Sequence, residues 1–406
     1  MMPPLEMSAA YPRPKLAILV SAASWLLVGC VPFPGGQGVV QVDTLPSGTI
    51  AVQNLQTLDI GRTDCLDATE ELRIGSVDAQ DGRGTQFSSI AAVGVMADGD
   101  ILAFDRMARE IRVYSPDGTL SHIIGRRGGG PGEFEWPDGL LIGDGGLIFV
   151  PDRMNVRISV FDSDGRLRAE YPRELSGEAA FPWPGNLHPD GGLVDWKIHR
   201  GFRPGLKYPS SVTYRPVLFS PDFRSQEEFP PIVWEVVSGT SGFPVPFLPL
   251  PILHLDRQGV LWLARGDEYR VVKRSLSGDT ILTFSSLAAP QKVSALERDT
   301  MAATWIPGRS IDPDEVPDEK PVLLQITTGD DRVLVFPRLQ GFRDGEVVDI
   351  YSRTGFFQHR VALPSPLVLE NRVPVFSGGK LYGVVKDELD VEYLVRFAWP
   401  IAGSTR

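Results

Sequence analysis

Basic side chains, with a few aromatic rings among them, are the residues of this sequence whose chemistry is clearest. The candidates for binding a ligand are Arg106, Arg126, Arg127, Arg153, Lys197, Arg200 and Arg203, with Phe202 and Tyr208 close to the last of them. Guanidinium groups bind carboxylates and sulfates through paired hydrogen bonds, and they also pack on aromatic rings. The set predicts a site for an anionic small molecule or a glycan. The alternative is that these cations pair with nearby Asp and Glu side chains.

Patterns that would indicate catalysis or metal binding are weak in this sequence. There is no GxSxG nucleophile motif, and the five histidines have no metal-ligand spacing. Asp105 and Asp152 are each followed by Arg, and we expect them to accept hydrogen bonds from the backbone of the next loop. The glycine-rich segment 125–134 lacks a Gly-Lys-Ser/Thr ending and is interpreted as a tight connection. The sequence therefore assigns no catalytic residue, no metal ligand and no cofactor.

Composition excludes several classes of protein. The chain has 406 residues, a net charge of −11 and 42% hydrophobic residues, which is enough for a folded core. An acidic chain without a basic run is a poor match for a nucleic acid, so none is expected as a partner. Two cysteines cannot form a disulfide framework.

The N-terminal segment has the pattern of an export signal. Arg13 and Lys15 precede an apolar run from Leu16 to Val28, which at about 13 residues is short for a membrane span of about 20. The run ends Leu27-Val28-Gly29-Cys30, which resembles the lipobox of bacterial lipoproteins. The resemblance implies a signal peptide over 1–29, lipidation at Cys30 and a tether over 30–46. The protein would then be exported and held by its lipid alone, in the outer membrane facing the periplasm or the cell surface.

An internal repeat organises the rest of the chain. Residues 100–118 align without a gap on 147–165, and both copies contain Asp-Arg-Met and end in Asp-Gly. Asp-Gly turns between alternating apolar runs indicate β-hairpins, and four short strands every forty to fifty residues are typical of a β-propeller. Six such units begin near Ser89, Trp136, Pro182, Pro246, Lys320 and Leu367. Either Thr49–Leu58 or Glu71–Ile74 would supply the strand that closes the ring.

Residues 85–165 resemble the NHL-type six-bladed β-propellers of exported bacterial proteins. The resemblance depends on the segments 125–134, 138–140 and 150–162, and it is loose over the other four units. The predicted fold is therefore all-β: a six-bladed propeller of four-stranded antiparallel blades over 47–406, with a short helical insertion in segment 285–318.

In a propeller, the loops after the second strand and the loops between blades lie on one face, and here they contain the candidate basic residues. Three insertions are expected, at about 197–210, 229–251 and 285–318. The last is either a lid over that face or a packed decoration. The Pro- and Phe-rich 229–251 either packs on the ring or offers a surface to an envelope protein.

The sequence favours a non-catalytic propeller that binds a ligand or a protein in the cell envelope. The alternative is a propeller enzyme of the lactonase or carbohydrate-lyase type, with a metal site in the central channel. Lactonase-like propellers surround such a metal with carboxylates, and Arg265 interrupts that ring here.

Overall fold

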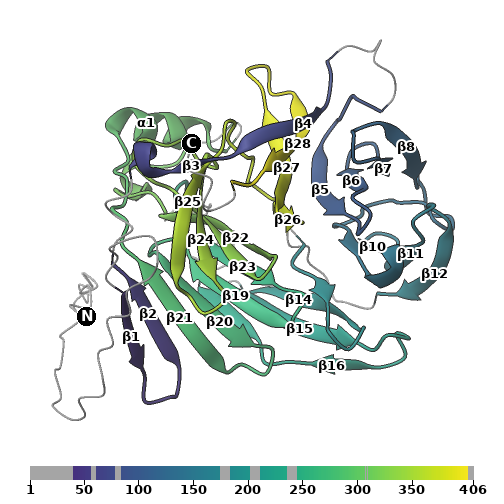
Figure 1. Cartoon of the computed structure of the whole chain (residues 1–406), viewed down its shortest axis with the longest axis horizontal. Helices are drawn as coiled ribbons and strands as arrows, with labels where there is room; N and C mark the ends of the chain where they lie inside the picture. Colours follow the sequence, from purple (N-terminus) through teal and green to yellow (C-terminus); the bar gives the residue numbers. More distant parts are fainter. Residues whose placement is uncertain are drawn as a thin grey trace, which may run out of the picture.

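The computed structural model describes residues 40–55, 61–77, 84–173, 183–201, 211–235, 245–306, 308 and 310–400. They form a six-bladed β-propeller, as the repeat predicts (Figure 1). The first blade is β5 (Ile90–Val95), β6 (Ile101–Asp105), β7 (Glu110–Tyr114) and β8 (Leu120–Ile124), and the second is β9 (Leu141–Ile142), β10 (Ile148–Asp152), β11 (Arg157–Phe161) and β12 (Leu167–Pro172). The third is β13 (Asn186–Leu187), β14 (Leu193–Gly201) and β15 (Ser211–Phe219), with β16 (Gln226–Glu228) and β17 (Ile232–Glu235) both paired to β15.

The last three blades each include strands from the N-terminal part of the chain. The fourth is β18 (Pro251–Leu255), β19 (Val260–Arg265), β20 (Arg270–Ser275) and β21 (Thr280–Ser286), extended by β2 (Ile50–Asn54) and β1 (Val40–Thr44). The fifth is β22 (Leu323–Gly329), β23 (Arg332–Pro337), β24 (Val347–Ser352) and β25 (Phe357–Ala362), with β3 (Leu66–Asp67) at its edge. The sixth is β26 (Val375–Ser377), β27 (Lys380–Lys386), β28 (Glu392–Ala398) and β4 (Thr69–Ile74).

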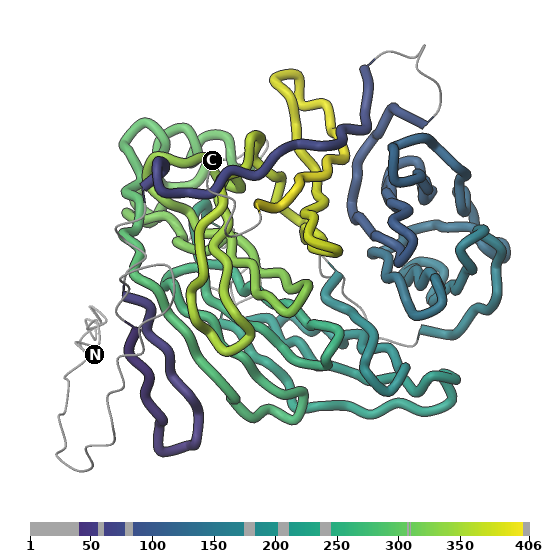
Figure 2. Tube along the Cα trace, viewed as in Figure 1, coloured from purple at the N-terminus to yellow at the C-terminus, as the bar shows by residue number. Residues whose placement is uncertain are grey.

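The ring is closed by β4, which pairs antiparallel with β28 near the other end of the chain (Figure 2). The second of the two expected closing segments is therefore the one used. The first contains β2, which instead pairs parallel with β21, and its Asn54 side chain bonds to the backbone of Gly355 and Phe357. The expected tether 30–46 overlaps β1 over Val40–Thr44, which pair with β2, while the signal peptide and Cys30 lie outside the described residues.

Turns of the predicted Asp-Gly type connect the strands of the first blade. Gly99 and Gly118 have φ values of 95° and 90°, a region that glycine enters without a steric penalty. Strand β6 is buried along its whole length, because neighbouring blades cover both of its faces. Each blade therefore packs face to face with the next around the ring.

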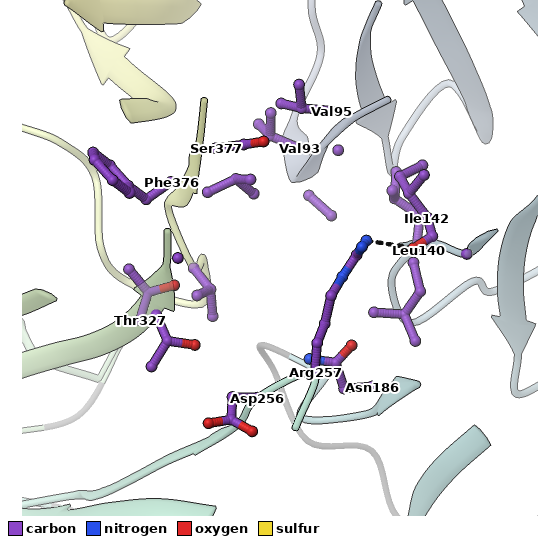
Figure 3. Close-up of a pocket in the computed structure, with 18 of the residues that line it drawn as sticks. Val93, Val95, Leu140, Ile142, Asn186, Asp256, Arg257, Thr327, Phe376 and Ser377 are labelled. Carbon is purple, nitrogen blue, oxygen red and sulfur yellow. Dashed lines mark hydrogen bonds between the residues drawn. The ribbon is translucent and has the colours of Figure 1, made fainter. Parts of the chain in front are cut away.

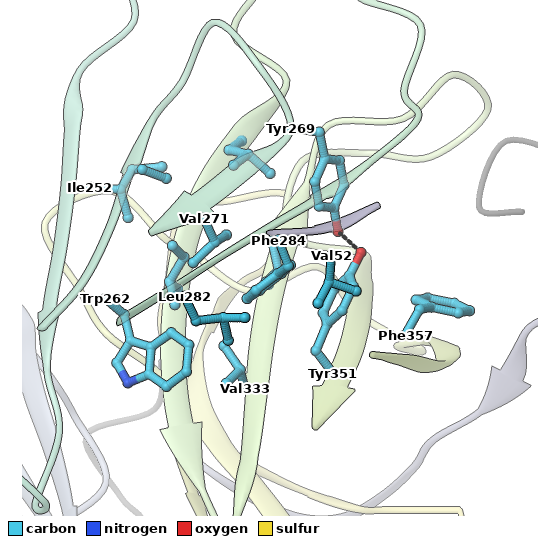
Figure 4. Packing of buried hydrophobic residues seen from close by; sticks show 14 of the residues in the cluster. Val52, Ile252, Trp262, Tyr269, Val271, Leu282, Phe284, Val333, Tyr351 and Phe357 are labelled. Atoms are coloured by element: carbon cyan, nitrogen blue, oxygen red, sulfur yellow. Dashed lines mark hydrogen bonds between the residues drawn. The ribbon is translucent and has the colours of Figure 1, made fainter. Parts of the chain in front are cut away.

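The core lies between the blades. Between the fourth and fifth blades, Trp262, Phe284 and Tyr351 are almost completely buried (Figure 4). The hydroxyl of Tyr351 donates to that of Tyr269 at 3.0 Å, and Tyr269 donates to the Asp349 carboxylate at 2.7 Å, so these polar groups have partners inside the core. Fixed contacts of this kind hold each blade at a defined angle to its neighbour.

A short helix, α1 (Ala295–Thr304), forms the expected helical insertion. Ser294 begins it with a capping box: its hydroxyl accepts from the Glu297 N–H, and the Glu297 carboxylate accepts from the Ser294 N–H. The hydrogen bond from Lys320, together with the cap, lowers the pKa of Glu297 to about 2. Helix α1 shares a small apolar core with Val245, Phe247 and Leu248 of the 229–251 insertion, so the described parts of the two insertions pack on each other.

Candidate functional site

A cavity of about 920 Å³ lies in the centre of the ring. Its lining comes from the innermost strands of all six blades and from the loops next to them (Figure 3). The innermost strands begin at Ile90, Leu141, Asn186, Pro251, Leu323 and Val375. A volume of this size is in the range that holds a small molecule or a short oligomer.

The walls combine apolar and polar groups. Val93 and Val95 of the first blade, Leu140 and Ile142 of the second and Phe376 of the sixth form apolar areas. Asn186, Thr327, Thr328 and Ser377 add short polar side chains. Such a wall can pack against the C–H surface of a ligand while bonding to its polar atoms.

Arg257 reaches across this space from the turn between β18 and β19 (Figure 3). Its Nη2 donates to the Ile142 carbonyl oxygen of the second blade at 2.6 Å. Within the described part of the chain the guanidinium forms no salt bridge, and its residue is exposed. A guanidinium has five N–H donors, so Arg257 has donors left for a ligand.

A histidine and an ion pair stand next to Arg257. The ring Nε2 of His254 is 2.9 Å from the Thr328 hydroxyl, and burial lowers the pKa of His254 to about 4, which keeps the ring neutral. Asp256 accepts hydrogen bonds from the Trp262 indole, at 2.8 Å, and from Arg353. These bonds fix the turn from which Arg257 extends.

The two ends of the cavity differ in charge. In an antiparallel blade successive turns alternate between the two ends of the sheet. The first turns of the blades therefore surround one end, and five cavity-lining carboxylates lie there: Asp98, Asp144, Asp256, Asp330 and Asp331. Arg353, which pairs with Asp256, and Arg257 line the cavity at this end too, and the five carboxylates outnumber these two arginines, so we call it the acidic end.

The opposite end contains a group of seven charged residues that we call the inner polar cluster: Arg106, Asp138, Arg153, Arg173, Asp195, Arg372 and Glu392. Arg173 is at the centre of the cluster and forms salt bridges with Asp138, at 2.5 Å, and with Asp195, at 2.6 Å. Asp138 also lines the cavity and is 4% exposed. Burial raises the pKa of Asp138, although Arg173 and Arg153 oppose the shift.

Two of the predicted ligand-binding residues, Arg106 and Arg153, belong to this cluster. Burial, and next the like charge of Arg372, lowers the pKa of Arg106. The guanidinium of Arg153 lies 5.8 Å from the centre of the Trp136 ring, and its Nε is buried with no hydrogen-bond partner in the described structure. These two arginines are the middle residues of the repeated Asp-Arg-Met motif in the first and second blades.

The other predicted residues lie elsewhere. Arg126 is 80% exposed and pairs with Glu133 at 2.8 Å, inside the connection between the first two blades, and Arg127 is exposed beside it. Lys197 pairs with Glu228 at 2.5 Å, across to the outer strands of the third blade. Arg200 is the last but one residue of β14 and lies close to Tyr214, and Arg203 lies outside the described residues. The structure therefore brings Arg106 and Arg153 together, but not Arg126 and Lys197.

The prediction for the two aspartates after the second strands is confirmed. Asp105 accepts from the backbone N–H groups of Ser88, Ser89, Met107 and Ala108. Asp152 accepts in the same way from Glu135, Trp136, Met154 and Asn155. The glycine-rich loop is likewise an inter-blade connection, in which the Gly130 N–H donates to Glu133 at 2.8 Å.

Other features of the described residues bear on the alternatives. No three His, Cys, Asp or Glu side chains among them are grouped so as to hold a metal ion. The described residues of 285–318 are not among those that line the cavity. Over the same described ranges, no helix has the length and apolar character that a membrane span requires.

Sequence analysis missed Arg257 and Asp138. Arg257 stands in the turn Asp256-Arg-Gln-Gly259, and the corresponding turns of the first two blades hold Ala97-Asp98 and Asp144-Gly145. An arginine at this position was the available clue, since these turns meet at one end of the channel. Asp138 had no comparable clue, because its partners Arg173 and Asp195 belong to two later segments.

Comparisons with known proteins agree with the fold. A family model described as a six-bladed β-propeller matches residues 85–175, and no curated protein sequence matches the chain. A protein of Bacteroides fragilis described as exported is 9% identical, with a TM-score of 0.50, over 86% of this chain and 100% of that one. A catalytically inactive virginiamycin B lyase of Staphylococcus aureus (12% identity, 81% and 99% covered) and a gluconolactonase of Xanthomonas campestris (11%, 82% and 97%) score 0.41 and 0.38. What the chain shares with the first of these proteins is the architecture of a six-bladed β-propeller.

Proposed function

We propose that this protein is a non-catalytic, ligand-binding propeller of the bacterial cell envelope that holds a carbohydrate in its central channel. One observation carries the proposal: Arg257 crosses a cavity of about 920 Å³ without forming an ion pair in the described structure. The mixed wall supports a hydroxyl-rich ligand, because sugars present both C–H faces and closely spaced hydroxyls. The excess of carboxylates at the acidic end disfavours a ligand with negative charge throughout.

Replacing Arg257 with Gln tests this function. The change removes the guanidinium and keeps a polar side chain, so we expect affinity for a bound oligosaccharide to fall about tenfold or more, since hydrogen bonds from charged donors contribute about 1.5–3 kcal/mol. Isothermal titration with a panel of neutral and acidic oligosaccharides measures the effect. The matched control is Arg224→Gln, at an arginine that is 87% exposed and distant from the cavity lining. Equal affinity in wild type and Arg257→Gln would contradict the proposal.

We also propose that the chain is an NHL-type propeller lipoprotein, anchored through Cys30. The pattern Leu27-Val28-Gly29-Cys30 after a short apolar run supports this, and two or more acyl chains on one residue give stable membrane attachment. Cys30→Ser should move the protein from the membrane fraction to the soluble fraction when cells are fractionated. The matched control is Cys65→Ser, because Cys65 is a half-buried free thiol of the folded part. A Cys30→Ser protein that stays in the membrane fraction would refute the lipid anchor.

A further inference from the structure

The inner polar cluster reaches the cavity through Asp138, opposite the acidic end, and it contains buried polar atoms that lack partners in the described structure. The Oδ1 of Asp138 is one of these, and the Nε of Arg153 is another; neither has a hydrogen-bond partner in the described part of the structure. Buried polar groups in native proteins are nearly always hydrogen-bonded, and an orphan is costly. An unmatched acceptor and an unmatched donor in one cluster suggest that a bound group supplies the missing bonds.

The chemistry of that group follows from the two orphans and from the local charge. A hydroxyl can donate to Asp138 and a carboxylate can accept from Arg153. The inner polar cluster contains four arginines (Arg106, Arg153, Arg173 and Arg372) against three carboxylates (Asp138, Asp195 and Glu392), so it carries a net charge of +1. A ligand ammonium would be repelled there, and a carboxylate would be attracted.

The chain sets an upper limit on the distance between Asp138 and the residue that Arg257 contacts. Asp138 precedes β9, and Ile142 lies four residues after Asp138 in the same segment. Arg257 donates to the carbonyl oxygen of Ile142. Four residues of extended chain span at most about 13 Å. Two or three sugar units have a comparable length, so one ligand can reach both ends of the cavity.

From these observations we infer that the ligand is an acidic oligosaccharide, with its carboxylate-bearing sugar at the inner polar cluster and its neutral part against Arg257. In this arrangement Asp138 accepts a hydrogen bond from a sugar hydroxyl, and Arg153 binds the sugar carboxylate. This inference depends on the proposed function, since it specifies the class and the orientation of the bound carbohydrate.

A matched pair of probes tests it on the purified full-length protein. An aldobiouronic acid, a disaccharide of one uronic acid and one neutral sugar, carries a single carboxylate, and its methyl ester has the same skeleton without that charge. We expect the wild type to bind the acid about tenfold more tightly than the ester. Arg153→Gln should remove that preference, and Arg257→Gln should weaken both probes by similar factors. Arg166→Gln is the control, because Arg166 is 74% exposed and pairs with Asp164 on an outer turn.

Asp138→Asn is the second variant. Arg173 donates to Oδ2 of Asp138 and would hold the amide oxygen in that position, so the amide NH2, a donor, would face the ligand hydroxyl. We expect about tenfold weaker binding of both probes, with a thermal melt confirming that the variant is folded. If the preference for the acid persists in Arg153→Gln and Asp138→Asn binds like the wild type, the inference is overturned while the channel function stands. If neither probe binds the wild type but neutral oligosaccharides do, the acidic class is wrong. If no saccharide binds, both proposals fail together.

Discussion

At the scale of single residues, the aspartate and the arginine of the repeated Asp-Arg-Met motif have different roles. Asp105 and Asp152 direct both carboxylate oxygens at backbone N–H groups and are fully buried. The arginine that follows each of them belongs to the inner polar cluster. The aspartate thus fixes the loop, and the fixed loop places the arginine near the channel.

Asp105→Ala should therefore destabilise the protein strongly. The change leaves four backbone donors and the buried Arg112, 3.6 Å from Asp105, without this carboxylate. We expect a loss of about 3–5 kcal/mol in the free energy of unfolding, measured by urea titration. Asp117→Ala is the matched control in the same blade, since Asp117 accepts from Thr119 and Ser115 in an exposed turn and should cost below about 1 kcal/mol. Similar losses for the two variants would refute the capping role.

At the scale of elements, the fold was predictable where the chain repeats itself. The gap-free alignment of 100–118 on 147–165 corresponds to the second and third strands of the first two blades. The closing strand was ambiguous, because the apolar run Ile50–Val52 and the alternating Glu71–Ile74 both fit a short strand. The structure distinguishes the two segments by the strand that each one pairs with: β2 pairs with β21 of the fourth blade, and β4 pairs with β28 of the sixth.

The site was less predictable than the fold, for a physical reason. Strand order determines the end of the blade at which a loop lies, so the sequence could assign the basic loops to one face. It could not show which cations are already neutralised. Arg126 turns to Glu133 within its own loop, and Lys197 reaches Glu228 across the third blade. Pairings of this kind depend on side-chain directions that a residue pattern does not contain.

At the scale of the whole molecule, closure of the ring maintains the cavity. The lining residues come from segments between Ala91 and Ser377, so the cavity exists only while all six blades are held in a circle. The first and last blades are joined through β4, whose Ile74 is 5% exposed and packs with Tyr382 and Leu394. A defect in this one strand should therefore affect stability and ligand binding together.

Ile74→Asp tests that dependence. A carboxylate at this buried position has no cationic partner in its apolar cluster, so we expect a loss of about 3–5 kcal/mol in the free energy of unfolding and faster proteolysis of the sixth blade. Val42→Asp is the control: it introduces the same charge in the outer strand β1, where Val42 is 45% exposed, and should change stability by about 0.5 kcal/mol or less. If Ile74→Asp unfolds at the same urea concentration as Val42→Asp, ring closure does not depend on β4.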